Sequence, residues 1–235
     1  MDSTSHFKAE PRRGIKVTAL NKNALPAVFD VYIPHGTTEI PKNAFKDSPL
    51  LLSVAIPDTV TVIKKSAFEG CENLQVVKIP NSVKSIEESA FAGCRNLVSA
   101  VLPTSLTSIG SQAFRSCPLL KSINLPESVV SMGEYTFLGS GVTSIVIPKS
   151  ISMIQAGTFR NCSNLTSIVI PPSVTTIGSE VFLGSGLTSI AIPASVTAIE
   201  SRTFFNCKNL TSVAIPGSVT SIGNNAFQNC ESLTS

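Results

Sequence analysis

Residues 210–230, LTSVAIPGSVTSIGNNAFQNC, are one copy of a pattern that recurs along most of the chain. The step from an apolar residue to proline sets the register of the pattern. Its prolines are 23 residues apart except for two intervals of 22, and they are Pro34, Pro57, Pro80, Pro103, Pro126, Pro148, Pro171, Pro193 and Pro216. A fixed period of roughly 20–29 residues is typical of a solenoid, in which each repeat forms one coil.

The first half of each copy predicts a short strand. In residues 210–230, Val213 and Ile215 alternate with Ser212 and Ala214, which is the two-residue period of a strand with one buried face. Pro216 ends this strand because proline has no amide proton for a ladder hydrogen bond.

Two further columns predict the core. After the proline, Val219 and Ile222 turn inward, and the pair Ala226-Phe227 lies in a segment that predicts one short helical or 3-10 turn. Stacked coils would place the phenylalanine rings in one spine, formed by Phe45, Phe68, Phe91, Phe114, Phe137, Phe159, Phe182, Phe204 and Phe227. The aliphatic column is Ile40, Ile63, Ile86, Ile109, Met132, Ile154, Ile177, Ile199 and Ile222. We expect both columns to be core side chains and not cofactor contacts.

The repeats resemble those of the BspA-like (treponemal-type) leucine-rich repeat proteins. The likeness rests on LQVVKIPNSVKSIEESAFAGC, residues 74–94, and its copies, and it covers the chain from about residue 28 to the C-terminus. The resemblance implies an α/β solenoid: a right-handed leucine-rich repeat array with a parallel β-sheet on the concave face and short helical or 3-10 turns and loops on the convex side. By analogy with the family it also implies binding or adhesion in place of catalysis.

The chain divides into three segments. Residues 1–13 are polar and charged and predict a disordered arm. Residues 14–33 lack an Ala-Phe pair and predict an N-terminal capping segment that shields the end of the core. Residues 34–235 form the leucine-rich repeat domain of about nine repeats of 22–23 residues. The last residues, 231–235, begin another strand without a polar cap, so we expect that the natural protein continues or that a partner subunit covers this end.

One column, three residues after the phenylalanine, holds all the cysteines: Cys71, Cys94, Cys117, Cys162, Cys207 and Cys230. Coils stack about 4.8 Å apart, which holds parallel Cβ atoms farther apart than the ~3.8 Å of a disulfide. We expect buried thiols that pack as small hydrophobic groups; disulfides and a metal site are the alternatives. The two 22-residue repeats lose the cysteine and one residue together, in Phe-Leu-Gly-Ser-Gly at 137–141 and 182–186.

The composition limits the classes of function that the chain can have. Only 14% of residues are charged and the net charge is +3, which is too small to argue for nucleic-acid binding. No apolar run approaches the roughly 18–20 residues of a membrane span. No signal peptide is visible at the N-terminus. The sequence therefore allows a cytoplasmic protein or a trimmed form, whereas the resemblance favours the cell surface or secretion.

The repeats carry few groups suited to catalysis. The two histidines, His6 and His35, lie near the N-terminus and leave the array without a usual general base. The acidic residues are scattered, and no glycine-rich phosphate loop is present. We predict no enzyme activity, no catalytic or metal-binding residue and no cofactor. Three Asn-x-Ser/Thr glycosylation sequons begin at Asn161, Asn164 and Asn209. A structural role in turns accounts for these asparagines better than glycosylation does.

The outward positions of the predicted sheet are the candidate binding surface. One outward column is mostly serine: Ser53, Val76, Ser99, Ser122, Ser144, Ser167, Ser189 and Ser212. Contiguous exposed apolar patches usually mark an interaction site. From these columns we predict partner contacts at Val76, Lys78, Val101, Asn124, Val146, Val169, Ala191 and Ala214. The alternative is a weakly functional face of a Ser/Thr-rich repeat.

We therefore predict a non-catalytic protein-interaction or adhesion scaffold that binds a partner protein, from a host or a second copy of the chain, through the concave strip of Ser, Thr and Val. The alternative is a self-assembling structural protein whose concave face or C-terminal end is buried in a homo-oligomer. Low charge motivates the alternative, because residues 136–199 contain only Lys149, Arg160 and Glu180 as charged residues.

Overall fold

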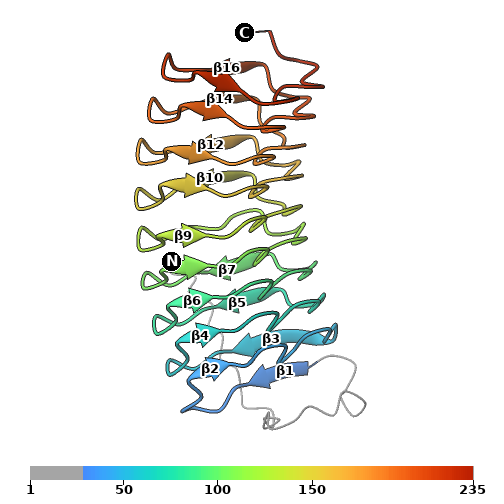
Figure 1. Ribbon diagram of the computed structural model, residues 1–235. Coiled ribbons are helices and arrows are strands. Elements are labelled where there is room, and N and C mark those ends of the chain that lie inside the picture. The colour runs from blue at the N-terminus through green and yellow to red at the C-terminus, as the bar shows by residue number, and fades with distance from the viewer. Residues whose placement is uncertain (1–28, 235) are drawn as a thin grey trace, which may run out of the picture.

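The repeats stack as coils in a single column in the computed structural model, which describes residues 29–234 (Figure 1). The predicted arm at 1–13 and most of the predicted capping segment lie outside the described residues, so both stay predictions. The first described strand, β1 (Phe29–Tyr32), pairs parallel with β3 (Leu51–Ala55) and opens the array.

The predicted strand positions form parallel strands along one side of the column, paired in three groups, and we call them together the first sheet. After β1 and β3 it contains β5 (Val76–Lys78), β7 (Ser99–Val101), β10 (Ser144–Val146), β12 (Ser167–Val169), β14 (Ser189–Ala191) and β16 (Ser212–Ala214). Equivalent residues of neighbouring coils pair, as in Val76 with Ser99 and Lys78 with Val101. The predicted parallel sheet is confirmed.

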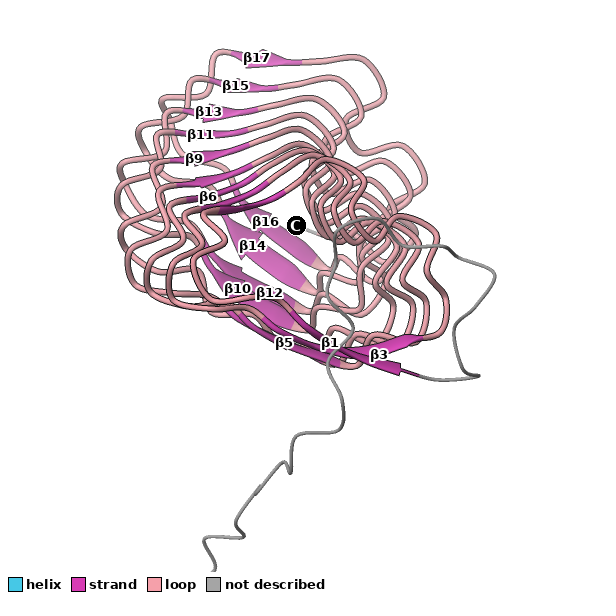
Figure 2. Cartoon of the chain, turned by 90° about the horizontal axis from the view of Figure 1, so that it is seen from below, coloured by secondary structure: helices cyan, strands magenta, loops and turns pink. Residues whose placement is uncertain are grey.

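A second parallel sheet runs along a different side of the column (Figure 2). Its two-residue strands are β2 (Glu39–Ile40), β4 (Val62–Ile63), β6 (Ser85–Ile86), β8 (Ser108–Ile109), β9 (Ser131–Met132), β11 (Met153–Ile154), β13 (Thr176–Ile177), β15 (Ala198–Ile199) and β17 (Ser221–Ile222). The sequence predicts the buried isoleucine column but not this sheet, because two residues are too few to display an alternating pattern.

The segment around each Ala-Phe pair is not helical, so the predicted helical or 3-10 turn is wrong for residues 29–234. Alternate amides point in different directions: the Phe68 amide donates to Ala90 of the next coil at 2.8 Å, whereas the Glu69 amide closes a tight turn onto Ser66 at 3.3 Å. Ser66 and Gly70 have φ values of 55° and 71°. A helix needs negative φ throughout and every amide bonded within the segment. The chain is therefore a β-solenoid and not an α/β one.

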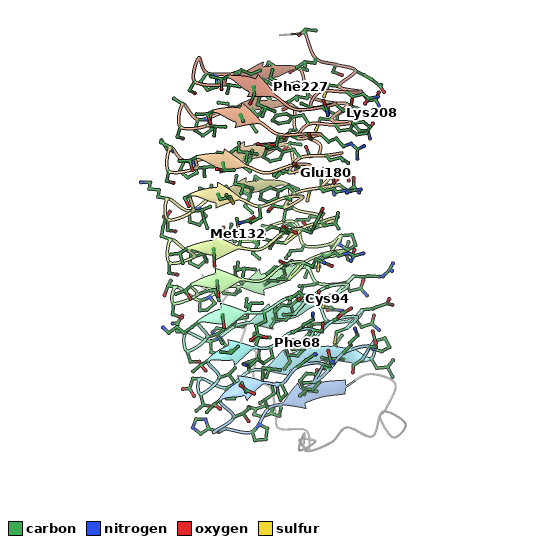
Figure 3. The ribbon with its side chains drawn as sticks, viewed as in Figure 1. Phe68, Cys94, Met132, Glu180, Lys208 and Phe227 are labelled. Atoms are coloured by element: carbon green, nitrogen blue, oxygen red, sulfur yellow. The ribbon has the colours of Figure 1, made fainter. Side chains whose placement is uncertain are left out.

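The phenylalanine column forms the predicted spine (Figure 3). Eight successive ring pairs are stacked, with centroids 5.1–6.0 Å apart and interplanar angles of at most 15°. The rings from Phe45 to Phe204 are buried, and Phe227 in the last coil is partly buried. The aliphatic column is buried from Ile40 to Ile199, but Ile222 is 57% exposed because no later coil covers it among the described residues.

Both sheets are interrupted at the two 22-residue repeats. Within the described residues, the second sheet pairs continuously from β2 to β9, then separately as β11–β13 and β15–β17, and the first sheet breaks before β10 and between β12 and β14. The amides of Gly133 and Gly178 donate to the preceding coil at 2.8 and 2.9 Å, but no such bond is made by Gln155 or Glu200. The turn ladder continues across both places, as in the 2.9 Å bond from the Phe137 amide to Thr158.

The cysteine column is buried, except that Cys230 is only partly buried. Each of the six thiols lies within hydrogen-bonding distance of the phenylalanine carbonyl of the preceding coil; the distance is 3.2 Å from Cys117 Sγ to Phe91 O. Ser140 and Ser185 take the cysteine position in the two short repeats and contact the next thiol at 3.5 and 3.4 Å. The thiols therefore pack as the small buried groups that the sequence predicts.

Candidate interaction surface

The outward face of the first sheet holds all eight predicted contact residues. Val76, Val101, Val146 and Val169 are 48–60% exposed although they lie in strands. The remaining four, also exposed, are Lys78, Asn124, Ala191 and Ala214. Asn124 belongs to the one coil whose strand is reduced to a single bridge, Ser99 to Ser122. The structure thus brings these residues onto one surface, and their role in binding stays a prediction.

Threonines border the C-terminal half of this face and are held by the coils themselves. Thr166 Oγ1 donates to the Thr143 carbonyl at 3.3 Å, and Thr211 Oγ1 donates to the Thr188 carbonyl at 2.9 Å. Their hydroxyl groups therefore have a partner inside the array, which reduces the polarity that this border offers to water. The outward columns from Val101 to Ala214 contain no charged residue.

Two exposed residues belong to this surface and were missed by the sequence analysis. Tyr32 pairs in register with Ala55, which continues the column of Lys78, and it is 67% exposed. Val98 immediately precedes β7 and is 46% exposed. The sequence could have identified Tyr32, because it lies two residues before Pro34, just as Ala55 lies two residues before Pro57.

Several charged residues elsewhere form ion pairs between neighbouring coils. Ion pairs join Lys46 to Glu69 at 3.0 Å and Lys65 to Glu88 at 2.8 Å. Glu180, which is 18% exposed, lies between two cations, Arg160 at 2.5 Å and Arg202 at 3.5 Å. On the first sheet, Lys78 and the neighbouring Lys121 have no ion-pair partner within residues 29–234, as is also true of Lys42, Lys84 and Lys149.

A shallow groove of about 490 Å³ crosses the second sheet over β6, β8 and β9. Its charged residues already have partners: Lys65 Nζ donates to Glu88, and the Lys65 amide donates to Glu87 at 2.9 Å. Small residues, among them Ser108 and Gly110, make up half of its lining. The groove therefore offers no unpaired acid or base for catalysis. In the part of the chain that the structure describes, no three His, Cys, Asp or Glu side chains gather as metal ligands.

Stacked coils with short parallel strands, a buried apolar spine and an outward-facing sheet define a leucine-rich repeat solenoid. The chain belongs to the family described as the BspA type leucine rich repeat region, whose model matches residues 38–164 and 131–235. Within residues 29–234, no helix is long and apolar enough to cross a membrane. No curated protein matches the chain.

Solved structures agree with this assignment. A leucine-rich repeat protein from Bacteroides ovatus is 29% identical with a TM-score of 0.71, over 87% of this chain and 59% of that chain. The T. pallidum leucine-rich repeat protein is 27% identical with a TM-score of 0.55, over 89% of this chain and 80% of that one. The pneumococcal vaccine antigen PcpA, at 21% identity and a TM-score of 0.63 over 87% of this chain and 60% of that one, supports the fold alone. The chain therefore spans about three fifths of the Bacteroides protein.

Proposed function

We propose that the chain is a non-catalytic protein-interaction or adhesion scaffold that binds a partner protein through the outward face of the first sheet. The observation that carries the proposal is the exposure of valine in the strands: Val101, Val146 and Val169 are 50–60% exposed in columns without a charged residue. Burying such a face against a partner gains about 25 cal/mol for each Å² of apolar area. Membership of a solenoid repeat family supports the same role, because stacked repeats present extended binding surfaces.

Selection from a random-peptide phage library tests the proposal. Peptides selected on the folded full chain should bind at least ~10-fold more weakly to the variant Val101→Lys/Val146→Lys/Val169→Lys, because three charges would lie in the contact. The matched control is Val130→Lys/Met153→Lys, which places charges at exposed apolar positions of and beside the second sheet. Equal loss in both variants, or no loss in the first, would show that the first sheet is not the binding surface.

Self-assembly is the second candidate function, and the same face supports it. Of the three charged residues between positions 136 and 199, Arg160 and Glu180 neutralise each other, so the C-terminal half has little charge to keep copies apart. Light scattering across a concentration series should then show oligomers that the triple lysine variant loses. A monomer at every concentration would eliminate this candidate.

A further inference from the structure

We propose that the partner is an acidic, extended protein segment whose carboxylates pair with Lys78 and Lys121 while its apolar side chains cover three valines between them. This inference rests on the proposed function and specifies the partner. We call the surface formed by Val76, Lys78, Val98, Val101 and Lys121 the valine–lysine patch.

The register of the strands assembles the valine–lysine patch. Val76 pairs with Ser99 and Lys78 with Val101 across β5 and β7. The bridge between Ser99 and Ser122 continues this order by one coil, so Lys121 neighbours Val98. Each of the three valines is 46–50% exposed. The three exposed valines therefore lie between the two lysines, within three adjacent coils.

Ion pairs neutralise Lys46, Lys64, Lys65 and Lys208, whereas the two lysines of the patch are among those without one. Where a pair forms, the carboxylate comes from a neighbouring coil, as in the pairs of Lys46 with Glu69 and Arg95 with Glu72.

At Lys78 the residues in the equivalent positions one coil away are Ala55 and Val101, and at Lys121 they are Val98 and Thr143. Neither lysine has an ion pair among the described residues. Asp30, the acid on the first sheet, already accepts a 2.6 Å hydrogen bond from Ser53.

This arrangement favours a carboxylate-bearing peptide over other partners. Two unpaired cations beside exposed valines complement an apolar segment with Asp or Glu at its flanks, and such pairs strengthen when the partner excludes water. A nucleic acid would need several more cations for its phosphates and would leave the valines without apolar contact. A face of parallel strands also matches an extended chain, whose side chains alternate at the strand spacing.

The test uses the phage library of the previous section on the folded full chain. Peptides selected on the wild type should be enriched in Asp and Glu next to apolar residues. Their affinity should fall at least ~10-fold with added salt and in Lys78→Glu/Lys121→Glu, because the charge attraction becomes repulsion. The reversed variant should instead select peptides rich in Lys and Arg. Lys42→Glu/Lys84→Glu is the matched control, since it reverses two exposed lysines outside the patch and leaves the same net charge.

The outcomes separate this inference from the function on which it rests. Peptides without acidic enrichment, bound equally by both double variants but lost in Val101→Lys/Val146→Lys/Val169→Lys, would overturn the acidic partner and keep the binding face. Peptides that bind both the triple lysine variant and Lys78→Glu/Lys121→Glu as tightly as the wild type, or a library that yields none, would overturn both. Oligomers of the wild-type chain in light scattering that Lys78→Glu/Lys121→Glu loses would identify a second copy as the occupant and would also overturn the acidic partner.

Discussion

At the scale of single residues, the stacked phenylalanines are the largest fully buried side chains of the core. Each inner ring is fully buried between two others, as Phe159 is between Phe137 and Phe182 with centroids 5.7 and 6.0 Å away. Removing such a ring leaves a cavity that its neighbours cannot fill, because the backbone of every coil is tied to the next by hydrogen bonds.

We therefore expect Phe159→Ala to lower the free energy of unfolding by about 3–5 kcal/mol. Phe227→Ala is the control and should cost less, because Phe227 is only partly buried and stacks on a single ring, Phe204. Urea denaturation followed by circular dichroism measures both. Similar losses in the two variants would show that burial in the ring column isn't the source of the stability.

The buried thiols make stability depend on pH above neutrality. Burial raises the pKa of Cys117 to about 12 and those of Cys162 and Cys207 to about 11. A cysteine thiol in the unfolded chain has a pKa of about 8.5. Because the folded pKa is the higher one, the stabilisation is complete below ~8.5 and is lost as pH rises toward the folded value.

We expect the free energy of unfolding to fall by about 1–2 kcal/mol per buried thiol at pH ~10 relative to neutral pH. Cys162→Ser should remove its share of this alkaline loss, since serine does not ionise there and already occupies the same column at Ser140. Denaturant titrations of both proteins across the pH range measure the difference. An identical pH profile for the variant would contradict a raised pKa at Cys162.

At the scale of elements, the missing residue in each short repeat decides where the sheets break. The path from Phe137 to Val142 is one residue shorter than that from Phe114 to Leu120. The next strands are not paired in either sheet at this place, while the turns around the phenylalanines stay bonded. A shortened connection therefore loosens both sheets but not the spine.

Hydrogen exchange should reveal these interruptions. The amides of Gln155 and Glu200 should exchange roughly 10-fold faster or more than those of Gly133, Gly178 and Gly223, because only the glycine amides donate to the preceding coil. NMR can measure the exchange rate of each of these amides separately, and all of them occupy the same position of the repeat. Uniform protection along the column would mean that the sheets are continuous in solution.

At the scale of the whole molecule, the strand pairing divides the column into three blocks, which the turn ladder joins. The N-terminal block reaches β9 with its second sheet unbroken, and it holds ion pairs such as Lys46 with Glu69 and Lys65 with Glu88. The two later blocks each contain a single strand pair in each sheet. Solenoid coils contact only their neighbours, so blocks can unfold in sequence.

We expect peptides from β10–β17 to lose exchange protection at lower urea than peptides from β2–β9. Exchange measured by mass spectrometry at increasing urea would follow both regions in one experiment. Loss of protection at the same urea concentration in all peptides would show that the two interruptions do not divide the column.

Much of this architecture was accessible from local patterns. The 23-residue period, the proline register and the apolar columns predicted a solenoid, its first sheet and a phenylalanine spine, because each depends on residue types that repeat in a fixed order. A further signal was overlooked: the column two residues after the phenylalanine has positive φ throughout and is rich in Gly and Asn, including Gly70 and Asn161. Those residues adopt the left-handed region at low cost and argue against a helix.

The sequence by itself determined the period, the core columns and the outward valines of this protein. Only the tertiary structure decided that the Ala-Phe segments are bonded turns, that a second sheet exists and that Lys78 and Lys121 lack the carboxylate that Lys46 and Lys65 find one coil away. The physical reason for this division is that burial and hydrogen bonding or ion pairing have different origins. Burial follows from each side chain's own chemistry, whereas amide bonds and ion pairs here depend on partners in adjacent coils, whose register appears only when the coils are stacked.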